Sequence, residues 1–389
     1  MLPETELVKA LCRAPLSTAA KQRIGALLES PLDWNAIFAL AARWELEPVV
    51  FSNLRSQYHE AIPKHVISRV IDRGRESRAF ALSRTLIMVE LVKRFEDAGI
   101  AVIVLKGPAV AIAAYGDPSL RTFGDMDLLL KKGDMVAGRE LLLSSGYARD
   151  YDAVVEDCLI RDQHALEFSG PRAKVELHWT LLSRHLRLDF NVDELWGSAR
   201  RIQGAGAEMR VLAPHHSFLF LCAHGAKHEW LRPRWMCDVA QLSVRLSHEE
   251  AKQVMQLADS THSRRILALG LRVARDVLGA DDSPFDPNLL VPEADTRRLV
   301  DKARKQHDAG DPSPMNGSAV PQSSFSRLEP GLPALLYWAS ARERRLDQVA
   351  CIARVFFVPT EKDRGPRVVG WLLRPLRLAV RAARTVVAR

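Results

Sequence analysis

The segment Arg121–Leu130, RTFGDMDLLL, decides how the chain folds. Its two aspartates, Asp125 and Asp127, are separated by one residue and followed by three leucines. In a β-strand, residues two apart share a face, so the two carboxylates project side by side while Met126 and Leu128 point the other way, into a core. Neighbouring carboxylates repel each other, and the usual natural solution is a divalent cation such as Mg²⁺, which prefers oxygen ligands and bound phosphates.

The sequence on both sides of this strand has the periodicity of an α/β unit. Upstream, the β-branched run AVIVLKG (Ala101–Gly107) ends on glycine, and PAVAIAAYG begins with proline, as helices often do. Downstream, MVAGRELLLSSGY predicts an amphipathic helix with Gly146 near its C-terminus, and HALEFSGPRAKVELHW predicts a hairpin around SGPR. An isolated Asp-x-Asp pair is more often a turn or a solvated strand edge, but this context favours a metal-phosphate site.

A third carboxylate lies in the second strand of the predicted hairpin, KVELHW. Glu176 and His178 share one face of this strand, and the apolar residues between and after them share the other. Two aspartates on one strand with an acid on a neighbouring strand can hold two metal ions, which would bridge the phosphates of a nucleotide and activate an acceptor hydroxyl. His178 could orient Glu176 or act as a base, or it is a hydrogen-bonded structural histidine.

Length and periodicity divide the chain into several units. A chain of 389 residues that is 47% hydrophobic is expected to form two or three packed units, since domains cluster near ~100 to 200 residues. Apolar residues recur at helical spacing before about residue 100 and again beyond Pro214. The predicted division is a helical N-terminal region (1–99), an α/β core (100–204), a helical C-terminal region (205–308), a flexible loop or linker rich in Pro, Ser and Gly (309–333) and a helical tail (334–389).

Composition argues against several classes of protein. The five cysteines are scattered, without the paired spacings of a zinc ribbon or a disulfide framework, which fits a reducing compartment. The first residues lack the basic start and apolar run of a signal peptide, and no segment reaches the ~18 uninterrupted apolar residues of a spanning helix. We therefore expect a cytoplasmic protein.

The net charge of +8 is concentrated near the C-terminus. A charged tail is a weaker clue to nucleic-acid binding than a basic groove, so nucleic acid is not an expected partner. The spacing of the arginines in the tail predicts a helix with a basic stripe. This stripe either contacts an anionic membrane surface or is the solvated face of a docked helix. The stripe consists of Arg367, Arg374, Arg377, Arg381 and Arg384.

The run LKGPAVAIAAYGDPSLRTFGDMDLLLKKGDMVAGRELLLSSGY, followed by VELHW and by HGAKHEW with a later Trp and Asp, resembles the bacterial uncharacterised nucleotidyltransferase family of the DNA polymerase β-like nucleotidyltransferase superfamily. The motifs span about Val104–Asp238. The resemblance implies an α+β fold, in which a minimal nucleotidyltransferase core with a small mixed β-sheet is flanked by N- and C-terminal helical regions. It also implies that Asp125, Asp127 and Glu176 are the catalytic and metal-binding acids, with Mg²⁺ (or Mn²⁺) as the cofactor.

The wider superfamily has a Gly-Ser pair after the first strand, where this chain has Lys106 and Gly107. Lys106 could contact a phosphate as a point charge, and Gly107 lets the backbone approach closely. Arg121 could grip a triphosphate in the bidentate way that lysine cannot, or it forms an ion pair with Asp117 or Asp125.

His224, Lys227 and His228 are spaced i, i+3 and i+4 on the helix before Pro233. This spacing predicts that they form one polar face of the helix. Two histidines at this spacing can bind zinc, but the sequence dictates no third ligand. The family resemblance favours a face turned toward the nucleotide, with Lys227 on phosphate; the alternative is a solvated face. Asp238 either anchors Lys227 or His228 or caps the following helix.

Together these observations predict an enzyme that moves a nucleoside monophosphate from a nucleoside triphosphate (NTP), such as ATP, to an acceptor hydroxyl or phosphate and releases pyrophosphate. Glu176 would help to remove the acceptor proton. The acceptor could be a small molecule, a peptide or a protein. One alternative is transfer of another group, such as a sugar, from a nucleotide-linked donor. Another is a non-catalytic nucleotide-binding or membrane-surface scaffold, against which the intact acidic trio argues.

Overall fold

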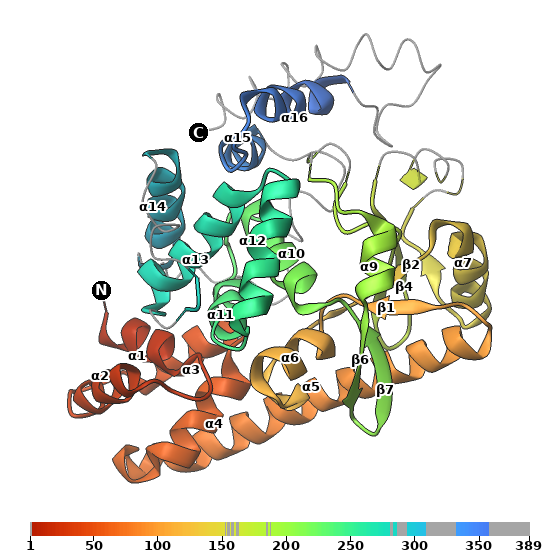
Figure 1. The fold of residues 1–389 in the computed structure, drawn as a ribbon. Helices are drawn as coiled ribbons and strands as arrows, with labels where there is room; N and C mark the ends of the chain where they lie inside the picture. Colours follow the sequence, from red (N-terminus) through yellow and green to blue (C-terminus); the bar gives the residue numbers. More distant parts are fainter. Residues whose placement is uncertain are drawn as a thin grey trace, which may run out of the picture.

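The computed structural model describes residues 2–151, 153, 156, 159–160, 163–183, 186, 188–280, 283–285, 294–308 and 332–357. The chain has a mixed α+β fold, as predicted, in which helices surround one seven-stranded mixed sheet (Figure 1). The basic stripe from Arg367 to Arg384 and all but the end of the predicted linker lie outside the described residues. No helix among the described residues is long and apolar enough to cross a membrane.

The sheet has the strand order β3-β4-β5-β2-β1-β7-β6, which places the strand with the two aspartates at its centre. The central strand β2 pairs with β5 in parallel and with β1 in antiparallel orientation, and β1 pairs with β7 in parallel. The predicted hairpin is formed by β4 and β5. The strands are β1 (Val102–Val104), β2 (Asp125–Leu130), β3 (Ala148–Arg149), β4 (Ala165–Ser169), β5 (Lys174–His178), β6 (Arg200–Gly204) and β7 (Ala207–Val211).

The N-terminal region is helical and ends in a long helix that supports the sheet. Helix α5 (Lys64–Asp97) runs along the molecule beneath the strands (Figure 1). Its buried residues Met88, Leu91 and Phe95 pack in one core with the apolar face of β2. The preceding helices are α1 (Pro3–Leu11), α2 (Thr18–Leu28), α3 (Trp34–Arg43), α4 (Glu47–Gln57) and the short η1 (His59–Ala61).

Short helices connect the central strands. Helix α6 (Pro108–Tyr115) starts with proline and is followed by Gly116 in the left-handed conformation, so both of its ends have residues that suit the local backbone. The other connections are η2 (Pro118–Leu120), η3 (Lys132–Asp134), α7 (Met135–Ser144) and α9 (Val192–Ser198).

The sheet extends beyond the predicted end of the core at residue 204. Strand β7 lies at 207–211 and pairs with both β6 and β1. The turn between β6 and β7 contains Ala205 and Gly206, both with positive φ, and Gly206 adopts this conformation without the strain of a side chain. Strand β6 (RRIQG) has little hydrophobic alternation, but β7 (AEMRV) alternates apolar and polar residues, a strand signal that was not used when residues 205–211 were assigned to the helical region.

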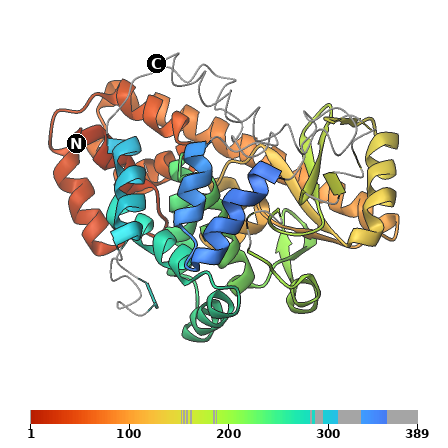
Figure 2. The same cartoon turned by 90° about the horizontal axis from the view of Figure 1, so that it is seen from above.

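A second group of helices covers the opposite face of the sheet. Ile103 and Leu129 point into a core that contains buried residues of this group, such as Phe218 and Leu221. Figure 2 shows α15 and α16 together, and α15 contacts α10 and α14. The helices are α10 (Pro214–Lys227), α11 (Pro233–Ser243), α12 (His248–Ser260), α13 (Arg264–Leu278), α14 (Ala294–Asp308), α15 (Leu332–Ser340) and α16 (Arg345–Phe357).

Candidate active site

Strand register brings the acidic residues together on one face of the sheet. In the parallel pair of β2 and β5, Asp127 lies opposite Glu176, and Leu129 lies opposite His178. Paired residues of neighbouring strands share a face, so Glu176 and His178 flank Asp127. On the other side of β5, Glu167 of β4 lies opposite Glu176. The face that was predicted from alternation in β2 therefore carries a row of carboxylates across three strands.

Three side chains of this row converge closely enough to bind one metal ion. Asp127, Glu176 and His178 each offer one ligand atom, and these atoms lie within 4.8 Å of one another. The Nε2 atom of His178 is 3.4 Å from Oδ1 of Asp127 and 3.3 Å from Oε2 of Glu176. The sequence analysis grouped Asp125, Asp127 and Glu176; in the described residues the converging trio contains His178 in place of Asp125.

Asp125 lies at the edge of this cluster, at the first position of β2. The residue is exposed to solvent, in contrast to the buried Asp127. Partial desolvation, together with the negative charges of Glu176 and Asp127, raises the pKa of the Asp125 carboxyl group. The negative charges of Asp127 and Glu176 therefore act on Asp125, and Asp125 is accessible to a ligand from solvent.

Lys106 compensates part of the negative charge. It is the second residue after the end of β1, and its Nζ atom lies 2.7 Å from Oδ1 of Asp127. Burial would raise the pKa of Asp127, but Lys106 and then His178 hold it well below its usual range. Burial would lower the pKa of Lys106, but Asp127 and Glu176 outweigh this effect and raise it. Both members of the pair are charged at neutral pH.

Gly107 has the backbone freedom that this position requires. Its φ is +60°, a conformation that residues with side chains rarely adopt. A Cβ atom at this position would also lie only 3.0 Å from the ring of Phe123. The amide of Leu105 donates to the carbonyl oxygen of Asp127 at 3.0 Å, which fixes the end of β1 against β2. This short segment thereby holds Lys106 over the carboxylates.

The C-terminal end of α10 covers the acidic face with three polar residues. Lys227 and His228 are buried, and the rings of His224 and His228 both pack against Trp235 at 5.1 Å. Burial lowers the pKa of Lys227 to about 8, while Glu176 opposes this shift. Burial, followed by nearby lysines, lowers the pKa of both histidines well below the usual value, so they are neutral.

These placements decide among the alternatives for α10. The face is buried near the carboxylates, so it is not a solvated helix face. His224 and His228 do not belong to a group of three convergent metal ligands in the described part of the chain. The contact of Lys227 with a nucleotide phosphate stays a prediction.

Arg121 and Asp238 form a buried pair, which corrects the expectations for both residues. Arg121 donates from Nε to Oδ1 of Asp238 at 2.7 Å and from Nη2 to Oδ2 at 2.8 Å, and the side chains are 4% and 0% exposed. Asp117 instead accepts from Arg78. Arg121 is thus committed to the interior rather than presented to a triphosphate. Asp238 does not cap α11, whose N-cap is Arg232, and both of its carboxylate oxygens accept from Arg121.

Arg84 supports the site but was not predicted from the sequence. It reaches from α5 to the carbonyl oxygens of Gly124 and Arg172, which precede β2 and β5. Its positive charge also lies near Asp125. The two parallel strands are thus joined at their N-terminal ends, where the acids begin. An arginine on a helix gives no sequence signal for such a long-range contact.

A cleft of about 410 Å³ opens beside the N-terminal end of β2. Gly124 on its wall directly precedes Asp125, and Phe123 on its wall packs against Gly107. The cleft therefore reaches the residue before Asp125, although Asp125, Asp127, Glu176 and His178 do not line it. Its other lining residues come from the N-terminal helices, the segment before β2 and α11, and are Ala42, Glu45, Glu47, Arg73, Glu76, Ser77, Phe80, Thr122 and Arg234.

The sheet, the acidic row and the lysine after β1 form the candidate active site of this α+β fold. The family model described as uncharacterised nucleotidyltransferase matches residues 30–279, and the chain belongs to this family, as its motifs predicted. A comparison with curated proteins gave no match. The matched segment contains the whole sheet and α10–α13, whereas α14–α16 follow it.

Proposed function

We propose that the protein is a metal-dependent nucleotidyltransferase that moves a nucleoside monophosphate from an NTP to an acceptor hydroxyl or phosphate, with release of pyrophosphate. Membership of the family supports nucleotidyl transfer in general. The observation that carries the proposal is the convergence of Asp127, Glu176 and His178 below the exposed Asp125. Asp127 is buried and Glu176 is half-buried, and carboxylates in such positions are costly unless a cation or a proton compensates them.

The donor atoms fit a divalent cation. Oδ1 of Asp127 and Nε2 of His178 are buried, and neither has a hydrogen-bond partner with good geometry. Asp125, Asp127 and Glu176 would supply oxygen ligands for Mg²⁺ or Mn²⁺, and His178 would be an acceptable further ligand for Mn²⁺. When bound, the metal would neutralise charge on the phosphates and make the acceptor oxygen easier to deprotonate.

The residues of the chain would then position the two reactants. Lys106, Lys227 and the backbone at Gly107 would hold the phosphates from the ends of β1 and α10. The acceptor would enter through the cleft beside Gly124, because Gly124 on its wall directly precedes Asp125. His224 and His228 would contribute neutral hydrogen-bonding groups near the nucleotide.

In the reaction, the acceptor oxygen forms a bond to the α-phosphorus, and the bond from this phosphorus to the bridging oxygen of the β-phosphate breaks. The electron pair of that bond leaves with pyrophosphate. Glu176 would take the acceptor proton. His178, 3.3 Å away, contributes to holding the pKa of Glu176 below its usual value despite burial and would orient its carboxylate.

A transfer assay with each α-³²P-labelled NTP tests this proposal, using Mg²⁺ or Mn²⁺ and a cell lysate as the source of acceptors. Label is expected on an acceptor with wild-type protein and not with the Asp125→Asn/Asp127→Asn variant. Asp150→Asn is the matched control, because Asp150 accepts from Ser169 at the edge of the sheet. Label from γ-³²P-labelled NTP in the acceptor, or equal transfer by the double variant, would contradict the proposal.

A further inference from the structure

The ion pair between Lys106 and Asp127 occupies an atom that the proposed metal needs. Nζ of Lys106 lies 2.7 Å from Oδ1 of Asp127, and this same oxygen is the one that faces Nε2 of His178. Asp127 is 5% exposed, so this side of its carboxylate has little access to other partners. The ammonium group therefore stands where the ligand atoms of the cluster converge.

An ammonium group and a divalent cation do not share one carboxylate oxygen easily. Mg²⁺ binds oxygen at about 2.0–2.1 Å, whereas a charged N–H···O contact has a length of about 2.7–2.9 Å. Both cations on Oδ1 would lie within a few ångströms of each other in a poorly screened interior, where like charges repel strongly. Metal binding to Oδ1 of Asp127 thus requires Lys106 to move away.

The structure shows that this pair lacks the geometry that locks a buried ion pair. Oδ1 of Asp127 has no well-directed hydrogen bond, even though the ammonium is near. By contrast, Arg121 holds both oxygens of Asp238. A lysine has a flexible four-carbon stem and a rotatable ammonium, so it can change partner without backbone movement.

We propose that Lys106 is an exchangeable internal cation, which neutralises Asp127 until a nucleotide arrives and then transfers to the polyphosphate as the divalent metal takes its place. This inference rests on the proposed function. The polyphosphate supplies the negative charge that Lys106 needs after leaving Asp127. Metal binding and nucleotide binding are consequently coupled, and each increases the affinity of the protein for the other by the same factor.

The test measures Mn²⁺ binding to the full chain by electron paramagnetic resonance of the free ion, with and without an α,β-methylene NTP analogue. Chelation by the analogue alone is corrected with protein-free titrations. Without the analogue, Lys106→Met and Lys106→Gln are expected to bind Mn²⁺ about 10- to 100-fold more tightly than wild type, because a charged contact no longer competes. In these two variants, the increase in Mn²⁺ affinity that the analogue causes should be smaller than in wild type by the same factor.

Two control variants separate exchange from a general change in charge. Lys106→Arg keeps the competing cation and should retain weak Mn²⁺ binding. Lys174→Met removes a lysine that pairs with Asp150 and Glu167, so its Mn²⁺ affinity should stay close to wild type. Circular dichroism melting checks that each variant is folded, and the glutamine variant keeps a hydrogen-bonding group where methionine could disturb packing.

Three outcomes would overturn the inference. Mn²⁺ affinity in both neutral variants could equal or fall below the wild-type value while Asp127→Asn still abolishes binding; the metal site would then stand and the exchange would not. Lys174→Met could tighten Mn²⁺ binding as much as Lys106→Met, and the loss of one positive charge would then explain the tighter binding without an exchange of partners. If wild-type protein bound Mn²⁺ in neither condition, the proposed metal-dependent function would fail together with the exchange.

Discussion

Two ion pairs each include a residue in or just before β2, and they differ in how completely their polar atoms are hydrogen-bonded. Arg121 and Asp238 form a bidentate pair with two hydrogen bonds, and Asp238 is fully buried. Lys106 and Asp127 meet through one contact, in a cluster that also contains Glu176. The first pair joins the segment before β2 to α11, whereas the second lies at the acidic face.

The difference indicates which pair stabilises the fold and which serves the reaction. In a bidentate pair with matched charges, the two hydrogen bonds offset the desolvation cost of both groups. Few of their polar atoms are then left to bind a ligand. The acidic cluster has more negative than positive groups, because Asp125, Asp127 and Glu176 are opposed mainly by Lys106 and His178. A partly buried cluster with more acidic than basic groups is expected where a cation is to be bound.

The largest expected effect comes from changing the second pair. Asp127→Asn should lower kcat by about 10³-fold or more, because a bound metal supplies several kcal/mol of transition-state stabilisation. Its free energy of unfolding should change little, since Lys106 stays near Glu176. Steady-state kinetics and urea unfolding measure the two quantities. A variant that unfolds easily but keeps its kcat would reverse the assignment of the two pairs.

The opposite outcome is expected for the first pair. Asp238→Ala leaves Arg121 buried without its partner and should lower the free energy of unfolding by about 3–5 kcal/mol. Urea unfolding would show this loss, while the kcat of the folded fraction stays near the wild-type value. The apolar double variant Arg121→Met/Asp238→Leu should recover much of the stability. Loss of activity without loss of stability would place this pair in the active site.

Sequence patterns predicted the elements that alternation controls. Apolar residues alternate with Asp125 and Asp127, so the face of β2 could be read directly, and the fold class followed from the neighbouring elements. The parallel register that sets His178 beside Asp127 is a contact between distant segments. The sequence therefore left open whether His178 orients Glu176, acts as a base or is a structural histidine. A strand pattern gives the face of a residue and not its partner.

Side-chain pairing was less predictable for the same reason. Arg121 and Asp238 are 117 positions apart, and nothing local distinguishes Asp238 from Asp117 or Asp125 as a partner. The contact of Lys106 with Asp127 depends on the backbone turn at Gly107. Long charged side chains reach several alternative partners, and tertiary packing selects one of them.

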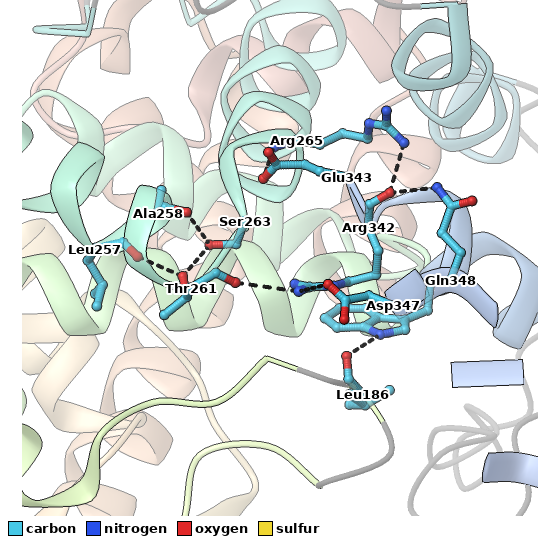
Figure 3. A network of polar contacts seen from close by, with 11 residues as sticks. Leu186, Leu257, Ala258, Thr261, Ser263, Arg265, Arg342, Glu343, Asp347 and Gln348 are labelled. Carbon is cyan, nitrogen blue, oxygen red and sulfur yellow. Dashed lines mark hydrogen bonds and ion pairs between the residues drawn. The ribbon is translucent and has the colours of Figure 1, made fainter. Parts of the chain in front are cut away.

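A third buried pair, between Arg342 and Asp347, extends the comparison beyond the segment that matches the family. Figure 3 shows Arg342 directed toward both Asp347 and the carbonyl oxygen of Thr261. Arg265 also donates to the carbonyl oxygen of Arg342 at 2.8 Å. These contacts tie the turn between α15 and α16 to the turn between α12 and α13, as the first pair ties its own segments.

Asp347→Asn should weaken the docking of α15 and α16 by about 1–3 kcal/mol, because Arg342 loses a charged partner. Hydrogen exchange should become faster in these two helices, and the affinity for an NTP analogue should not change. Glu343→Gln is a control on the same turn, since Glu343 accepts only from the backbone amide of Arg265 at 3.3 Å among the hydrogen bonds described for it. Loss of nucleotide affinity in Asp347→Asn would connect this region to the site.

The smallest expected effect concerns the second cation near the acidic face. Burial lowers the pKa of Lys227 to about 8 against the attraction of Glu176, with Lys106 also favouring the neutral form and Glu167 and Asp127 opposing it. Lys227 is therefore charged below pH 8 and neutral above it. Nucleotide affinity should fall by about tenfold between pH 7.5 and 9.5, when a charged contact with phosphate is lost.

Unfolding does not account for this loss, as the sign of the linkage shows. The folded protein releases the Lys227 proton at lower pH than the unfolded chain, so the contribution of this group to the free energy of unfolding rises between pH 8 and 10.5. Lys227→Arg keeps its proton throughout this range and should flatten the profile of KM for NTP against pH. An unchanged profile in this variant would assign the pH dependence to another group, and Lys227 would then stabilise the buried carboxylates without contacting the nucleotide.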